Sequence, residues 1–172
     1  MAQAKHRIDE INKMDKSTFM MAFGAVYEHS PWVAEEAWVH RPFSSVDNLH
    51  AVMDRVVERA GQNRQMILIK AHPELAGRLA RSGQLTAESR SEQAQAGLTS
   101  LPETLTSRML ELNRAYQQKF GFTFIICARL SNVSTILHAM ENRLANNQET
   151  EFQTALQEIS KIAKLRLGDI LV

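Results

Sequence analysis

The stretch FQTALQEISKIAKLR, residues 152–166, decides the fold class. Apolar side chains recur in it at Phe152, Leu156, Ile159 and Ala163, which is the spacing of one face of an α-helix. The same spacing occurs in four earlier stretches, residues 19–27, 46–56, 105–116 and 136–144. Alternating strand patterns are absent, and two short apolar runs, 65–71 and 123–130, cannot be typed by period alone. The sequence therefore predicts an all-α, single-domain compact bundle of about eight helices.

Helix ends are marked by residues with restricted or special backbone conformations. Pro31, after Ser30, and Pro102 are typical of a first helical turn, and Thr86 is a candidate N-cap. Gly121 follows an apolar stripe and is expected to end a helix as its C-cap. Loops between these signals are short and no Pro/Gly/Ser-rich linker divides the chain, so residues 1–172 are expected to form one domain.

Composition excludes several classes of protein. The chain has 172 residues, 44% hydrophobic and 23% charged, with a formal net charge of +1 and its Lys and Arg residues scattered. This pattern provides no basic patch for nucleic acid and no basic face for a membrane, and no apolar run reaches the length of a membrane span. The single cysteine, Cys127, lies in an apolar run and is expected to be a buried structural thiol, with a nucleophile as the less favoured alternative. A reducing cytoplasm is the expected location.

His72 is the first candidate functional residue. It precedes Pro73, whose ring disfavours helical geometry at the residue before it, so a helix arriving through residues 66–70 should stop here. The negative end of a helix dipole favours a protonated imidazole. A helix cap or a solvated side chain is the alternative. As a helix-end residue followed by proline, His72 is expected to have little packing to lose. The six histidines show no spacing typical of a zinc site.

Two further candidates involve polar side chains on helices. Ser89, Glu92 and Gln93 stand at i, i+3 and i+4 and therefore share one helix face. The alternative is a solvated polar face, although no ladder of opposite charges accompanies them. Arg166 falls on the apolar stripe of the last helix, where its guanidinium must reach solvent, pair with a buried carboxylate or meet an anionic ligand.

The order of these motifs resembles one enzyme family. His72-Pro-Glu-Leu-Ala-Gly77 is followed by Ser89-x-x-Glu-Gln, then by Asn-x-x-Tyr-x-x-Lys-Phe-Gly-Phe-x-Phe-Ile over 113–125, and finally by Leu-Arg-Leu over 165–167. With Glu-x-Ser-Pro-Trp at 28–32, this pattern is similar to the OHCU decarboxylases, which act on 2-oxo-4-hydroxy-4-carboxy-5-ureidoimidazoline and release (S)-allantoin in urate degradation. One departure is Thr123, where the family usually has proline.

The resemblance implies a cofactor-independent carboxy-lyase and assigns roles residue by residue. It makes His72 and Glu92 catalytic. It places Pro73, Ser89, Gln93, Arg166 and the backbone of Phe124, Ile125, Ile126, Cys127 and Ala128 in contact with substrate. The expected partner is this small molecule, with no metal, no nucleic acid and no membrane, and a homodimer is the candidate assembly. Arg166 and Glu92 are expected to converge on one cavity although they are far apart in sequence.

Two other functions are compatible with the residues alone. A non-catalytic helical interaction module would make His72, Glu92 and Arg166 a structural polar cluster. A zinc- or iron-dependent hydrolase is disfavoured because the chain lacks ligand motifs. A closed site that joins the three residues would favour the enzyme over the interaction module.

Overall fold

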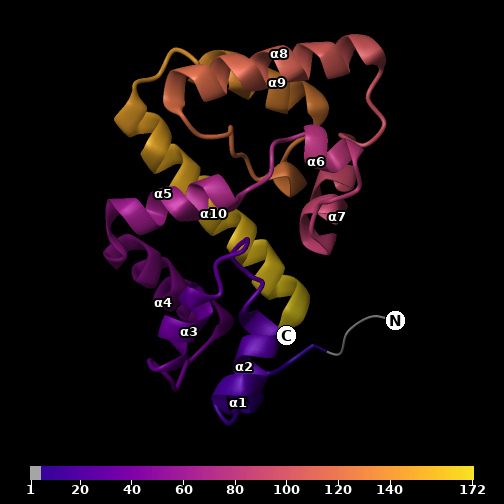
Figure 1. Cartoon of the computed structure of the whole chain (residues 1–172). Coiled ribbons are helices and arrows are strands. Elements are labelled where there is room, and N and C mark those ends of the chain that lie inside the picture. The colour runs from indigo at the N-terminus through magenta and orange to yellow at the C-terminus, as the bar shows by residue number, and fades with distance from the viewer. Residues whose placement is uncertain (1–4) are drawn as a thin grey trace. The chain divides into compact units, whose positions relative to one another are not determined.

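The computed structural model describes residues 5–172, apart from the side chains of Leu79 and Arg81, and these residues are mostly helical. The helices are α1 (Ile8–Ile11), α2 (Lys16–Phe23), α3 (Trp32–Trp38), α4 (Val46–Arg59), α5 (Gly61–Ala71), α6 (Arg78–Arg81), α7 (Ala87–Gln95), α8 (Glu103–Phe120), α9 (Val133–Arg143) and α10 (Gln148–Ile170), with a 3-10 turn, η1, at Ala128–Leu130 (Figure 1). Between residues 5 and 172 there is no β-strand, and one isolated bridge joins His6 to Leu171. The all-α prediction is confirmed.

Of the helices in this described part, α1 and α6 are single turns of four residues, and the other eight are longer. The expectation of about eight helices is therefore correct. None of them combines the length and the apolar composition that crossing a bilayer requires. The run at residues 65–71 belongs to α5, whereas residues 123–127 form no regular element and lead into η1.

Backbone contacts divide the chain into two compact units. The first consists of the residues up to Ala71 together with Ser160–Val172, and the second of His72–Ile159. Helix α10 therefore contributes its first part to the second unit and its last part to the first. The organisation of residues 1–172 as one domain stays a prediction.

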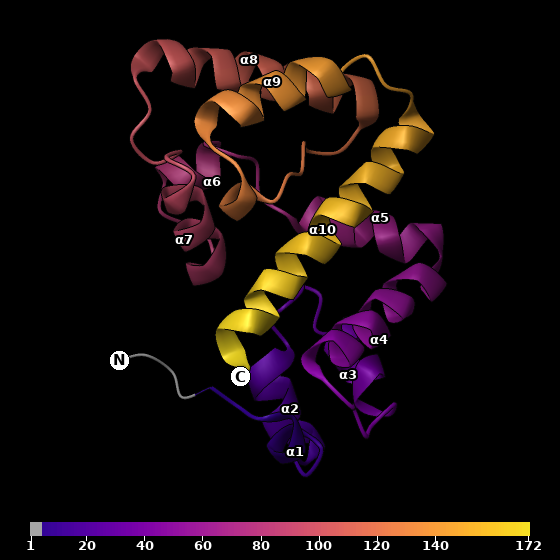
Figure 2. The ribbon, with the colours of Figure 1, turned by 180° about the vertical axis from the view of Figure 1, so that it is seen from behind.

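The first unit is built on α2, α3 and α4, which pack in sequence, with α5 following α4 (Figure 2). Its core contains Phe19, Phe23 and Phe43, which are all nearly inaccessible to solvent, and the Phe19 ring contacts the rings of the other two. Burying each aromatic side chain removes a large apolar area from water, which stabilises the unit. The last residues of α10 join this unit through the amide of His6, which donates to the carbonyl of Ile170 at 2.8 Å.

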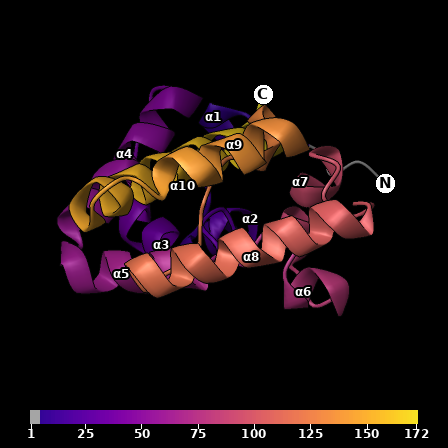
Figure 3. The same ribbon diagram turned by 90° about the horizontal axis from the view of Figure 1, so that it is seen from above.

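The second unit is built around α8 and α9, which run alongside each other (Figure 3). The Tyr116 ring of α8 contacts Phe120, Phe122 and Phe124, so an aromatic cluster joins the end of α8 to the irregular segment that follows it. Gly121 has the left-handed backbone, at φ 73°, that allows the chain to leave α8 and start this segment. The aromatic cluster thereby fixes where residues 122–128 lie.

Candidate active site

His72 lies where the sequence predicts a helix end, but its environment differs from the expectation. Helix α5 ends at Ala71, immediately before the His72–Pro73 pair, as the proline requires. The His72 side chain is only 8% exposed, so it is packed among other groups. The expectation that His72 has little packing to lose is therefore wrong, because its imidazole is buried. A buried imidazole near a substrate can transfer a proton without competition from bulk water.

The loop that follows His72 has an unusual backbone held by side chains from two helices. Ala76 adopts a left-handed conformation at φ 49°, which costs energy for a residue other than glycine. The Gln93 side chain of α7 compensates, since its Oε1 accepts from the Ala76 amide at 3.0 Å and its Nε2 donates to the Glu74 carbonyl at 3.4 Å. Asn113 of α8 donates to the Leu75 carbonyl at 3.0 Å. The loop is thus fixed in one shape by two buried amides.

The Ser89–Gln93 face of α7 is buried. Helix α7 begins where Thr86 caps it, with the Thr86 hydroxyl accepting from the amide of Ser89 at 3.2 Å. Ser89, Glu92 and Gln93 are 5%, 9% and 3% exposed, so the interpretation as a solvated polar face is wrong. Burial of a carboxylate such as Glu92 is costly unless it serves a partner or a ligand. The predicted site residues of α7 therefore lie inside the second unit.

The segment Phe124–Ala128 is the next predicted part of the site. Its side chains are buried apart from Ile126, which is partly exposed. Burial raises the pKa of the Cys127 thiol, and the negative charges of Glu158 and Glu92 raise it further. Helix α7 packs against η1, which places the Ser89–Gln93 face and this segment in the same part of the second unit. Cys127 is therefore a protonated, buried thiol, as the sequence predicts, and not an activated nucleophile.

Arg166 lies in the first unit and is 4% exposed, so it does not extend into solvent. Its guanidinium donates to the Glu28 carboxylate at 2.9 Å and to the Val26 carbonyl at 3.4 Å. Of the three outcomes open to it, pairing with a buried carboxylate is the one observed, and Glu28 is itself only 2% exposed. His72 and Glu92 belong to the second unit, and the convergence of Arg166 with Glu92 stays a prediction.

Several residues that support the site were not among the sequence candidates. Four of them are charged groups engaged in buried or partly buried contacts: Glu28, Arg143, Glu151 and Glu158. Asn113, which holds the loop after His72, was noted as part of a motif but was given no role. Glu151 and Glu158 are seven residues apart, and each lies next to a residue of the apolar stripe of α10. Arg166 was identified by its position relative to this stripe, and the same signal could have identified the two glutamates.

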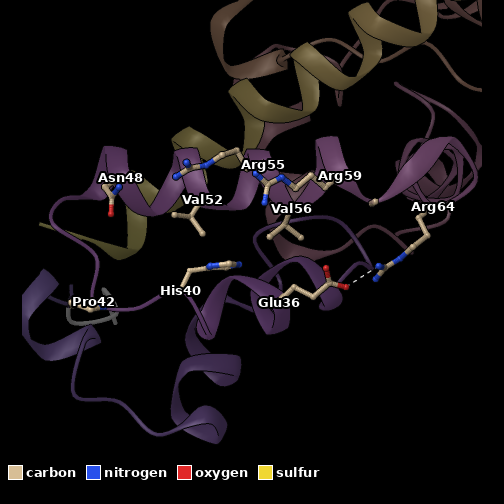
Figure 4. Close-up of a pocket in the computed structure, with 10 residues that line it drawn as sticks. Glu36, His40, Pro42, Asn48, Val52, Arg55, Val56, Arg59 and Arg64 are labelled. Carbon is tan, nitrogen blue, oxygen red and sulfur yellow. Dashed lines mark ion pairs between the residues drawn. The ribbon is translucent and has the colours of Figure 1, made fainter.

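A separate cavity of about 440 Å³ lies in the first unit and contains none of the predicted site residues. Figure 4 shows His40 and Glu36 facing Val52 and Val56 of α4 across it. Of the three arginines that line it, Arg64 is paired with Glu36 at 2.8 Å and stacked on the ring of Trp32. The candidate active site is therefore not this cavity. No group of three His, Cys, Asp or Glu side chains within residues 5–172 is arranged to hold a metal ion.

The fold and the site define an all-α protein with a buried imidazole beside a strained loop, a buried carboxylate and a supported stretch of irregular backbone. The family model of OHCU decarboxylases matches residues 12–168 of the chain. The chain belongs to the OHCU decarboxylase family.

Individual relatives extend over nearly the whole chain. The 2-oxo-4-hydroxy-4-carboxy-5-ureidoimidazoline decarboxylase of Halalkalicoccus jeotgali is 44% identical over 165 residues, which cover 96% of this chain and 92% of that protein. The decarboxylase of Mus musculus is 40% identical, covering 94% and 91%. The uric acid degradation bifunctional protein PucL of Bacillus subtilis is also 40% identical, but the chain covers 32% of it. The matched region is therefore an independent protein in some relatives and part of a longer one in others.

Solved structures agree with this assignment. A crystal structure of (S)-allantoin synthase superposes with a TM-score of 0.76 at 26% identity, covering 96% of this chain and 54% of that one. A structure of OHCU decarboxylase in the presence of (S)-allantoin superposes with a TM-score of 0.66 at 21% identity, covering 90% and 96%, and shows that the fold is shared.

Proposed function

We propose that this protein decarboxylates 2-oxo-4-hydroxy-4-carboxy-5-ureidoimidazoline to (S)-allantoin in urate degradation. The observation that carries the proposal is the family match over residues 12–168, which includes every candidate site residue from His72 to Arg166. The burial of His72, Ser89, Glu92 and Gln93 supports it, because an interaction module has no need to bury these groups.

The substrate supplies its own electron sink. When the bond between the ring carbon and the carboxylate breaks, CO₂ leaves and the released electron pair forms a double bond to the neighbouring ring carbon. The electrons of the C=N bond move to the ring nitrogen, which takes up a proton. A proton must then reach the carbon that bears the ureido group, on one face, and the ring hydroxyl becomes the carbonyl of allantoin. The protein has to orient the carboxylate, stabilise the developing charge and deliver the proton, which requires no metal or organic cofactor.

The proposed roles follow the chemistry of each group. His72 donates the proton or a hydrogen bond, and Glu92 accepts hydrogen bonds from ring or ureido N–H groups. Pro73, Ser89, Gln93 and the backbone of residues 124–128 shape the substrate site, and Arg166 provides a planar cation for an anionic or carbonyl oxygen. Because the Gln93 amide already holds the loop after His72, its role in binding includes fixing that loop. The proposed location is the cytoplasm, and a homodimer remains the candidate assembly.

The decisive experiment uses the freshly generated urate-oxidation intermediate and follows (S)-allantoin by circular dichroism. The purified protein, incubated with EDTA, should form optically active allantoin well above the spontaneous rate. Because the proposed mechanism uses protein side chains alone, chelation should leave this rate unchanged. Racemic allantoin formed at the spontaneous rate would reject the proposed function and favour the interaction module, whereas activity lost only on chelation would reject the cofactor-free mechanism.

A further inference from the structure

Two charged side chains hold the backbone of the irregular segment Phe124–Ala128. The Glu158 carboxylate of α10 accepts from the Cys127 amide at 2.7 Å, and the Arg143 guanidinium of α9 donates to the Ile125 carbonyl at 2.8 Å. Glu158 is 9% exposed, so this contact forms in a largely dry environment, where a charge-assisted hydrogen bond is strong. Neither residue has a role in the function proposed above.

These two contacts occupy one amide and one carbonyl of the segment. Cys127 has an extended backbone, at φ −69° and ψ 93°. The Cys127 amide is occupied by Glu158 and is not a donor for substrate.

We propose that Glu158 is a positioning residue that sets the backbone of residues 124–128 for substrate binding. The inference rests on the proposed function, in which this backbone contacts substrate. Arg143 acts as the second anchor and is itself held by the carboxylate of Glu151 at 2.9 Å. Removing the Glu158 carboxylate leaves the buried Cys127 amide without this acceptor, and the segment then shifts to find another. Glu158 thus acts on substrate through the backbone and does not touch the reacting atoms.

The test measures KM and kcat, and the inhibition constant of (S)-allantoin, for Glu158→Ala, Glu158→Gln and a control. The segment binds parts of the molecule that do not change during decarboxylation, so its displacement should weaken substrate and transition state alike. Glu158→Ala should raise KM and the inhibition constant about tenfold while kcat changes less than about threefold. Glu158→Gln keeps an acceptor oxygen for the Cys127 amide and should stay within about twofold of the wild type.

Gln148→Ala is the matched control. Gln148 also lies on α10 and holds a backbone carbonyl, that of Phe120 at 2.8 Å, which is outside the segment. This variant should lose stability with KM unchanged. If Glu158→Ala does not fold, Glu158→Asp retains the charge but shortens the reach to Cys127 and should still raise KM. An unchanged KM in the folded Ala or Asp variant, or an equal rise in the control, would overturn the positioning role. An inactive wild type would reject the proposed function itself.

Discussion

His72 is a buried imidazole whose neighbours along the chain leave it little freedom. Pro73 restricts the backbone of His72 on one side, and α5 ends at Ala71 on the other. Such restriction suits a general acid, because proton transfer requires the donor to lie within hydrogen-bond distance of the acceptor atom in the bound substrate.

Replacing His72 by Gln should lower kcat by about 10²-fold, the usual contribution of a positioned acid. Gln keeps much of the side-chain volume, which matters because His72 is buried, and so the fold should be retained. The control is His138→Gln, at an exposed position on α9, for which kcat should not change. Steady-state assays with circular dichroism check both variants. Wild-type kcat in a folded His72→Gln protein would leave His72 with a structural role.

At the scale of the elements, the sequence predicts helices well because their ends carry local signals. Thr86 caps α7, Gly121 ends α8 and α5 stops before His72, each as expected from the residue type. The segment at residues 123–127 could not be assigned, because a short apolar run is compatible with a strand, a buried helix or irregular chain. Its shape depends on contacts that the run itself does not reveal, with the aromatic ring of Tyr116 on the preceding helix and with Glu158, which is 31 positions from Cys127.

The loop from His72 to Gly77 provides a prediction at the same scale. Asn113→Ala removes the donor to the Leu75 carbonyl and leaves that buried group unsatisfied, which should cost about 1–3 kcal/mol of stability. Because the loop carries His72, kcat should fall as well. The control is Asn132→Ala, which removes the N-cap of α9, where the side chain accepts from Thr135, and should cost about 1 kcal/mol without changing kcat. Urea unfolding and kcat are the measurements, and wild-type kcat in Asn113→Ala would contradict the coupling.

At the scale of the whole molecule, what the sequence could not reveal is the pairing of distant charged groups. Glu28 and Arg166 are 138 positions apart, and Glu158 and the Cys127 amide are 31 apart. Sequence periodicity shows that a charged residue lies near an apolar stripe, but not which partner it meets, because the partner is set by how the elements pack. The candidate residues could therefore be identified individually, whereas their supporting contacts required the structure.

Glu151 accepts hydrogen bonds from several side chains at once, and its ionisation links the stability of the molecule to pH. It is inaccessible to solvent, and burial raises its pKa, but hydrogen bonds from Arg143, Tyr116 and Asn146 outweigh this effect and lower the pKa below its ordinary value. A carboxylate with a lowered pKa stabilises the folded state at pH values above the unfolded-state pKa, about 4.3. This contribution is lost as the pH falls through the folded-state pKa, when Glu151 takes up a proton.

The wild-type protein should therefore lose unfolding free energy as the pH falls below about 4.3, since the folded state must protonate a carboxylate that it holds ionised. Glu151→Gln leaves Arg143, whose side chain is 12% exposed, without its negatively charged partner. The variant should lose about 3–5 kcal/mol of unfolding free energy at neutral pH. The same variant has no carboxyl to titrate at this position, so its stability should fall less steeply with acidification. Urea unfolding of both proteins between neutral and acid pH measures the two curves. Parallel curves would show that Glu151 does not carry the acid sensitivity, and equal stability at neutral pH would show that the Arg143 pair contributes nothing to the fold.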